Sequence, residues 1–155
     1  MEIIPYDKRS GKIWFNGKNV DWSDAKIHLL SHGLHYASSV FEGIRVYDGE
    51  VFKLEEHTDR LFYSAKRLGM DVPYTLGEIN KATKEIVDIQ KTKNGYIRPI
   101  IWRGSEMMAI SAQKNKINVA IATWEWGSYF DPKLKIEGIK LNISSWRRPS
   151  PASIP

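Results

Sequence analysis

The alternation of apolar and polar residues predicts two β-hairpins in the first third of the chain. Residues 12–22, KIWFNGKNVDW, hold two short strand-like runs on either side of Asn16-Gly17. Two-residue hairpin turns prefer this dipeptide because both central residues need positive φ. Residues 39–54, SVFEGIRVYDGEVFKL, repeat the arrangement around Asp48-Gly49. Two hairpins so close together indicate an antiparallel sheet.

Apolar residues at helical intervals predict two helices in the middle of the chain. The first carries Leu54, Leu61, Ala65 and Leu68, and Gly69 stands where a left-handed C-terminal cap is expected. The second begins after a capping box formed by Thr75 and Glu78 and stops at Asn94-Gly95. Its buried face is expected to consist of Leu76, Ile79, Thr83, Ile86 and either Ile89 or Gln90.

Strand-like sequence returns in the last third, and it completes the predicted fold. Residues 96–104, 117–126 and 139–148 each have the composition and length of a strand. The predicted order is therefore two hairpins, two helices and three strands. This order is typical of an α+β domain, a mostly antiparallel sheet with two helices packed against it.

Composition excludes several classes of protein. The 155 residues suffice for about one domain. No cysteine is present, which excludes disulfides, cysteine-ligated zinc, iron–sulfur clusters and a thiol nucleophile. Neither a signal peptide nor an apolar run long enough to span a membrane is visible. We expect a soluble, cytoplasmic protein with no membrane partner.

The chain is basic, with 23 Lys and Arg against 18 Asp and Glu and a formal net charge of +5. This charge allows a nucleic-acid-binding module as one alternative. The cations are, however, spread along the chain. We therefore favour a solvated basic surface and predict no nucleic-acid partner, while small anionic ligands such as phosphates and carboxylates remain open.

Two predicted strands each place an aromatic residue and an arginine on one face. In VFEGIRVY, the side chains of Phe41, Arg45 and Tyr47 share a face with the gap at Gly43. An aromatic ring, a gap and a cation in line indicate a ligand-binding wall, although a solvent-exposed face explains them equally well. The opposite face of this strand carries Val40, Glu42, Ile44 and Val46.

The strand YIRPIIW aligns Tyr96, Arg98, Ile100 and Trp102 on one face, with Ile97 and Ile101 on the other. Arginine suits carboxylates and phosphates because its planar fork binds two oxygens at once. The alternative is an ion pair between Arg98 and a glutamate of the core side. Pro99 cannot donate to a sheet ladder, so the strand is interrupted, lies at an edge or turns this position outward.

The segment HLLSHGLH offers a metal site as a rival interpretation. On a helix, His28, His32 and His35 would share one face, as in a zinc site with three histidine ligands. Gly33 lies among them, strand-like sequence follows at once, and no nearby Asp or Glu is spaced as a general base. We favour hydrogen-bonding histidines in a loop and predict no metal.

Five motifs, in uninterrupted order, give the chain a specific resemblance. They are DAKIHLLSHGLHYASSVFEGIRVYDG, EEHTDRL, YIRPI, EWGSY and SSWRRPSPASIP. Together they resemble the branched-chain amino-acid aminotransferases, which are pyridoxal 5'-phosphate (PLP) enzymes of fold type IV. The resemblance covers nearly the whole chain, from about residue 12 to the last residue.

The resemblance implies a role for each matching residue. Arg60 would bind the phosphate of PLP, and Tyr96 and Arg98 would bind substrate carboxylates. The remaining pocket residues would be Phe41, Gly43, Arg45, Trp126 and Tyr129, with Tyr36 and Ile110 contributed across a homodimer interface. Substrates would be branched-chain amino acids, glutamate and their 2-oxo acids. We expect Phe41, Arg45, Arg60, Tyr96 and Arg98 to converge on one cavity.

The chain departs from the family at two positions and stops before a third feature. Ala37 stands where glycine is common, and the loop tip often written Leu-Gly-Val is MMAI, residues 107–110. In the family, the lysine that binds PLP covalently follows the SSW…IP segment by a few residues. We therefore expect residues 1–144 to be an N-terminal domain and residues 145–155 the start of a linker to a second domain. Such a fragment would contain no catalytic residue and be inactive alone.

Overall fold

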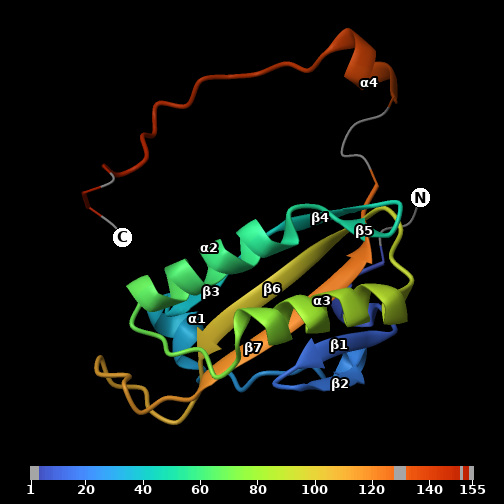
Figure 1. Cartoon of the computed structure of the whole chain (residues 1–155). Helices are drawn as coiled ribbons and strands as arrows, with labels where there is room; N and C mark the ends of the chain where they lie inside the picture. The colour runs from blue at the N-terminus through green and yellow to red at the C-terminus, as the bar shows by residue number, and fades with distance from the viewer. Residues whose placement is uncertain (1–3, 128–131, 151, 154–155) are drawn as a thin grey trace.

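The computed structural model describes residues 4–127, 132–150 and 152–153. Its centre is a seven-stranded antiparallel sheet in the order β2-β1-β7-β6-β4-β5, with β3 paired to β6 beside β4 (Figure 1). The strands are β1 (Lys12–Phe15), β2 (Lys18–Asp21), β3 (Ser39–Phe41), β4 (Ile44–Tyr47), β5 (Glu50–Val51), β6 (Gly95–Arg103) and β7 (Ile117–Glu125). The helices are α1 (His32–Tyr36), α2 (Leu54–Arg67), α3 (Leu76–Gln90) and α4 (Pro132–Glu137), and Tyr6–Lys8 and Trp22–Asp24 form 3-10 turns. The predicted α+β class is confirmed.

Both predicted hairpins form with the expected turn geometry. Asn16 and Gly17 join β1 to β2 with φ values of 47° and 88°. Asp48 and Gly49 join β4 to β5 with φ values of 50° and 87°. Positive φ at both central residues matches the right-handed twist of the flanking strands, which explains why these dipeptides fix the register of each hairpin.

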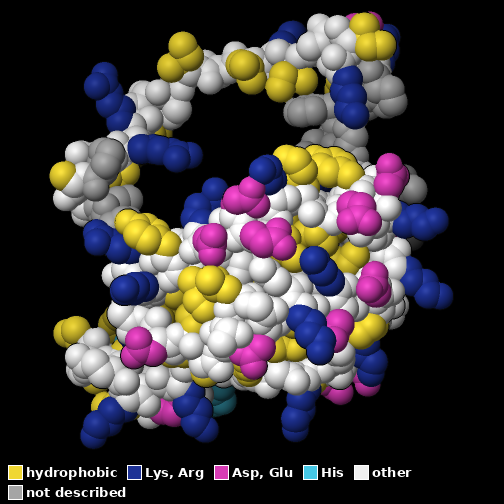
Figure 2. All heavy atoms as spheres, viewed as in Figure 1, with side chains coloured by type: hydrophobic (Ala, Val, Ile, Leu, Met, Phe, Trp, Pro, Cys, Tyr) yellow, Lys and Arg dark blue, Asp and Glu magenta, His cyan; other side chains and the backbone are white. Residues whose placement is uncertain are grey.

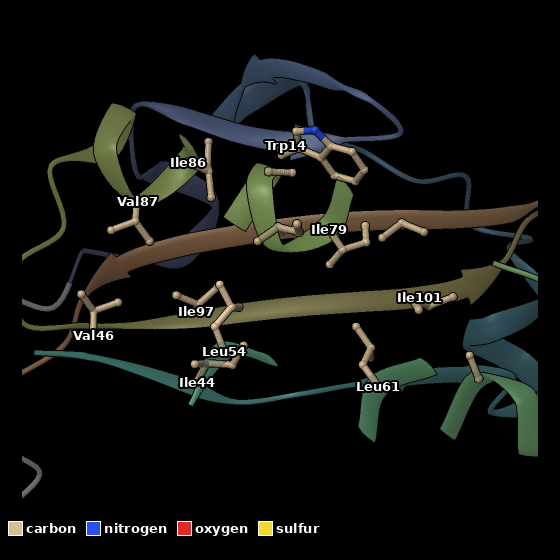
Figure 3. Close-up of a cluster of buried hydrophobic side chains, with 14 of the residues drawn as sticks. Trp14, Ile44, Val46, Leu54, Leu61, Ile79, Ile86, Val87, Ile97 and Ile101 are labelled. Carbon is tan, nitrogen blue, oxygen red and sulfur yellow. The ribbon is translucent and has the colours of Figure 1, made fainter. Parts of the chain in front are cut away.

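Helices α2 and α3 cover one face of the sheet, and the core lies between the two layers. Figure 3 shows Leu54 and Leu61 of α2 and Ile79 of α3 directed toward the strands, where Ile44 and Ile97 meet them. All five side chains are almost completely buried. Burying a side chain of this size contributes about 1.5–3 kcal/mol, so this layer fixes the sheet on which the site is built.

The ends of the two long helices mostly agree with the sequence. Gly69 has the predicted left-handed φ, 63°, just after α2, and Thr75 forms the predicted capping box with Glu78 at the start of α3. One predicted position is wrong, because Leu76 is exposed, and of the two alternatives at the end of the face Ile89 is exposed whereas Gln90 is half-buried. The buried face of α3 instead uses Ile79, Ala82, Thr83, Ile86 and Val87, which is the tighter i, i+3, i+4, i+7, i+8 stripe of a helix on a sheet.

The strand predicted over residues 139–148 does not form. Its apolar side chains are exposed, with Leu141 at 86% and Ile143 at 95%, and the segment extends away from the sheet after α4 (Figure 1). Strand β7, which precedes it, already has β1 on one side and β6 on the other. The segment therefore has no adjacent edge to pair with, and an unpaired strand is not stable. None of the described helices is long and apolar enough to cross a membrane.

Candidate functional site

The predicted strand alternation places the aromatic and arginine residues on the face of the sheet opposite α2 and α3, which we call the outer face. In β4, Ile44 and Val46 are buried against the helices, so Arg45 between them points to the outer face. In β6, Ile97 and Ile101 are buried in the same way. Tyr96, Arg98, Ile100 and Trp102 therefore share the outer face with Arg45.

A break between β3 and β4 lies directly beside Pro99. The carbonyl of Pro99 accepts a hydrogen bond from the amide of Glu42, at 3.1 Å, so the backbone of Pro99 faces the strand break. The nitrogen of a strand residue points to the same side as its carbonyl. The proline nitrogen, which has no hydrogen to donate, thus faces Glu42 and Gly43. These two residues lie between β3 and β4 and belong to neither. The interruption predicted from Pro99 is therefore in the neighbouring strand.

Gly43 leaves space that the Tyr96 side chain fills. A Cβ atom at position 43 would collide with the hydroxyl group of Tyr96. The same hydroxyl accepts a hydrogen bond from Nη2 of Arg98, at 3.1 Å. The gap predicted at Gly43 is therefore filled by the chain's own Tyr96, whose hydroxyl reaches Arg98 two residues along the same strand, β6.

Arg98 is a half-buried cation without an acidic partner among the described residues. Its guanidinium lies 4.0 Å from the centre of the Phe41 ring and 5.3 Å from that of Tyr96. Its Nε atom is buried and has no hydrogen-bond partner in the described part of the chain. The ion pair with a core-side glutamate, our alternative for this residue, is not formed. A buried donor without an acceptor is costly unless a ligand completes it.

Aromatic rings border Tyr96 on its other side. The ring centre of Tyr96 lies 4.9 Å from that of Trp126 and 5.3 Å from that of Trp124. Nη1 of Arg45 donates to the backbone carbonyl of Trp126, at 3.2 Å, and its guanidinium lies 5.3 Å from the Tyr47 ring. Phe41, Gly43, Arg45, Tyr96, Arg98 and Trp126 are therefore neighbours on the outer face. Tyr129 lies outside the described residues.

Arg60 approaches the same strand break from the side of α2. Its Nε and Nη2 atoms donate to the two carboxylate oxygens of Glu42, each at 2.5 Å, and Nδ1 of His57 lies 2.9 Å from the second oxygen. Glu42 is buried, whereas 61% of the Arg60 side chain is exposed. Burial alone raises the pKa of Glu42, but the hydrogen bonds and charges of Arg60 and His57 outweigh it and hold that pKa below its usual value.

Four of the five residues expected in one cavity therefore lie together, and Arg60 lies apart from them. Phe41, Arg45, Tyr96 and Arg98 share the outer face, while Arg60 is bound to Glu42 on the side of α2. The two groups are joined through the backbone, since Glu42 lies between Phe41 and Gly43.

An apolar groove of about 300 Å³ extends along the outer face from Arg98. Its lining includes Phe15, Leu34, Ile100, Trp102 and Ala122. Leu34 and Ile27, which also lines the groove, are exposed. A cation beside an apolar groove can hold the carboxylate of a ligand while the groove holds an aliphatic part.

Tyr36 and Ile110 line a common pocket at a different place, beside the loop between β6 and β7. The Tyr36 hydroxyl donates to the carbonyl of Met108, at 3.1 Å, and Ile110 is 91% exposed at the tip of this loop. Both residues therefore lie at this loop and are exposed. Their predicted role in the site of a neighbouring subunit stays a prediction.

The three histidines do not form a metal site. His32 and His35 belong to α1, His28 precedes it, and each ring hydrogen-bonds to its own protein partner. No group of three potential ligands occurs among the described residues. The hydrogen-bonding interpretation is confirmed, although a short helix replaces part of the predicted loop.

The charged side chains of the surface are mixed in sign. Figure 2 shows basic side chains interspersed with acidic ones over the face in view.

The residues that sequence reasoning missed are Glu42 and His57. Glu42 shares the core-facing side of the predicted strand VFEGIRVY with Ile44 and Val46, and it is buried. A carboxylate at such a position is seldom buried without a cation, and this signal could have pointed to Arg60. His57 and Arg60 are spaced i, i+3 on a helix, so they face the same partner. Trp124, which strand alternation places on the same face as Trp126, also contacts Tyr96.

Comparison with known proteins agrees with this geometry. Residues 39–155 match the family described as Amino-transferase class IV. The chain is 44% identical over 144 residues to the branched-chain-amino-acid aminotransferase of Pseudomonas aeruginosa, covering 90% of this chain and 47% of that protein. The chain thus spans about half the length of such relatives.

Solved structures show the same fold. The branched-chain amino acid aminotransferase of Escherichia coli superposes with a TM-score of 0.84 at 38% identity, over 95% of this chain and 49% of that one. A second such enzyme, from T.th., is complexed with N-(5'-phosphopyridoxyl)-L-glutamate and gives a TM-score of 0.73 at 41% identity, over 76% of this chain and 41% of that one. The metal-binding and nucleic-acid-binding alternatives gain no support. The chain belongs to the class IV aminotransferase family.

Proposed function

We propose that the complete protein is a PLP-dependent branched-chain aminotransferase that transfers the amino group of leucine, isoleucine or valine to 2-oxoglutarate. The names of the relatives and their identity of about 40% to this chain support the reaction. This chain covers only about half of their length, which supports a second domain in the complete protein. In this proposal, residues 1–144 form the N-terminal domain and residues 145–155 begin the linker to the second domain.

The single observation that carries the proposal is the Arg98 guanidinium, which has no acidic partner among the described residues and lies beside an apolar groove. A half-buried guanidinium of this kind, held by Tyr96 and by the Phe41 ring, suits the carboxylate of a ligand. The adjoining apolar groove suits a branched aliphatic side chain. One site could therefore accept both glutamate, through its side-chain carboxylate, and leucine. The similar enzyme complexed with a phosphopyridoxyl-glutamate supports an amino acid with two carboxylates as one substrate.

Arg60 fits the phosphate of the cofactor. Glu42 holds one edge of its guanidinium, and Nη1 has no partner among the described residues. The guanidinium keeps its charge, since the hydrogen bonds to Glu42 raise the pKa of Arg60 further. A fixed, exposed arginine binds phosphate well because its free donors match two phosphate oxygens. When bound, PLP supplies the electron sink for the carbanion formed as the amino acid loses its α-proton.

The remaining parts of the site are proposed to lie outside the chain. The lysine that binds PLP and moves the proton would follow Pro155 by a few residues, so the chain alone would be inactive. Tyr36 and Ile110 would contact the site of a second subunit in a homodimer. Location of the protein in the cytoplasm, which the cysteine-free composition led us to expect, stays a prediction.

Assay of the complete protein with PLP, leucine and 2-oxoglutarate tests the proposal. We expect glutamate to form at the rate at which leucine is consumed, with cofactor absorbance in the visible range. The chain of 155 residues should give neither. Absence of transamination by the complete protein, combined with stoichiometric zinc or with tight, salt-dependent binding to nucleic acid, would replace the proposal by one of the alternatives.

A further inference from the structure

His32 is a buried histidine that the proposed chemistry does not use. Only 4% of this residue is exposed, and both ring nitrogens are occupied. Nδ1 lies 2.6 Å from the hydroxyl of Ser38, and Nε2 lies 3.0 Å from the carbonyl oxygen of Ala109. A carbonyl only accepts, so Nε2 carries a proton, and the Ser38 hydroxyl can donate to a neutral Nδ1. The ring also stacks on Tyr36, with 4.3 Å between centres.

The partner of His32 lies in the loop between β6 and β7, residues 104–116. Three successive carbonyls of this loop accept hydrogen bonds from side chains, those of residues 107, 108 and 109. Their donors are Asn115, Tyr36 and His32, at 3.0, 3.1 and 3.0 Å. Carbonyls of an exposed loop ordinarily face water. Two of these three are instead held by α1, which lies more than 70 residues earlier in the chain.

These bonds determine how the loop tip is presented. The carbonyl of Ala109 and the amide nitrogen of Ile110 belong to one planar peptide group. The hydrogen bond from His32 therefore fixes the orientation of the backbone immediately before Ile110. With the carbonyls drawn inward, the Ile110 side chain projects outward, and it is 91% exposed.

We propose that His32 is a positioning residue for substrate selection, acting through Ile110. It holds the peptide group before Ile110 so that this side chain forms a fixed apolar surface, and a fixed surface distinguishes aliphatic side chains better than a mobile one. The inference rests on the proposed function, in which Ile110 lines the pocket of the neighbouring subunit. The Tyr36 hydroxyl, which donates to the carbonyl of Met108, holds the adjacent peptide group in the same way.

Two substitutions separate the roles of the ring nitrogens. The amide of His32→Asn can replace Nδ1 but does not reach Ala109, whereas the longer His32→Gln can place a donor near the position of Nε2. His35→Gln is the matched control, because His35 lies on the same helix and contacts the carbonyl of Leu29 instead of the 104–116 loop. All three are compared with wild type in the complete, PLP-loaded protein.

For His32→Asn we expect faster amide hydrogen exchange in residues 105–113 and a KM for leucine raised about fivefold, with kcat changed less than about twofold. His32→Gln should restore most of both properties, and His35→Gln should match wild type. Wild-type loop exchange or wild-type KM in His32→Asn would overturn the inference. Equal losses in the Asn and Gln variants would also overturn it, since the Ala109 bond would then be irrelevant.

A second variant covers the case in which His32→Asn does not fold. Tyr36→Phe removes the bond to Met108, and a smaller increase in loop exchange over residues 105–113 is expected. Unchanged loop exchange would contradict the inference. If the wild-type protein shows no transamination, the proposed function fails, while the exchange measurements still test whether His32 holds the loop.

Discussion

The hydroxyl of Tyr96 occupies the space that a Cβ atom at Gly43 would need. Gly43 lies in the break between β3 and β4, Tyr96 lies on the adjacent strand β6, and their contact directs the hydroxyl to Arg98. The strand break beside Pro99 lets the backbone at Gly43 come this close. A small residue at the strand break thus determines where the cation of the adjacent strand is held.

Gly43→Ala should therefore damage the substrate site without unfolding the protein. The added methyl group would push the Tyr96 ring aside and release Arg98, and we expect kcat/KM to fall about 10- to 100-fold for glutamate. Steady-state kinetics of the complete protein measure this effect. Gly77→Ala is the control, because a Cβ there meets nothing within 4 Å. Equal activity of the two variants would show that the Tyr96 position is unimportant.

The ion pair of Glu42 with Arg60 predicts a pH dependence of stability. The folded-state pKa of Glu42 is lowered from 4.5, so its contribution is complete above that value and is lost as pH falls through the lower folded pKa. Denaturant titrations give the free energy of unfolding at each pH from about 7 to about 3. The fall of this free energy with falling pH should be less steep in Glu42→Gln than in wild type, by at most about 1.4 kcal/mol per pH unit. Parallel curves for the two proteins would exclude this role.

Ala37 has a left-handed backbone, with φ of 52°, where it ends α1. This conformation costs a residue with a Cβ about 1–2 kcal/mol, and glycine adopts it freely. Since glycine also gains about 0.4–1 kcal/mol of unfolded-chain entropy, Ala37→Gly should raise the free energy of unfolding by about 0.5–1 kcal/mol. Ala25→Gly, at an ordinary φ of −72°, should lower it. A loss of stability in Ala37→Gly would contradict the expectation.

The role of Arg60 can be tested by cofactor binding alone. Arg60→Ala should weaken PLP binding about 10- to 100-fold, since it removes charge-assisted hydrogen bonds to phosphate. Titration of the complete apoprotein, followed by cofactor absorbance, gives the dissociation constant. Arg67→Ala, an exposed position on the same helix, provides the control. An unchanged dissociation constant for PLP in Arg60→Ala would show that Arg60 does not bind the cofactor phosphate.

Local patterns predicted the outer face because strand alternation is a strictly local property. Arg45, Tyr96 and Arg98 could be assigned to one face from the order of residues alone. Arg60 could not, because the face that it approaches depends on how α2 packs across the sheet. Glu42 was the available clue, as a carboxylate among core residues. The strand over 139–148 failed for a similar reason, since pairing depends on which sheet edges remain free.

The substrate preference of Arg98→Ala tests the central claim most directly. If the unpaired guanidinium binds the side-chain carboxylate of glutamate, its removal should lower kcat/KM for glutamate about 10- to 100-fold more than for leucine, which has no such group. The ratio of the two values, measured in the complete PLP-loaded protein, cancels general losses of folding or cofactor. A larger loss with glutamate is the result expected. Equal losses with both substrates would contradict the role assigned to Arg98.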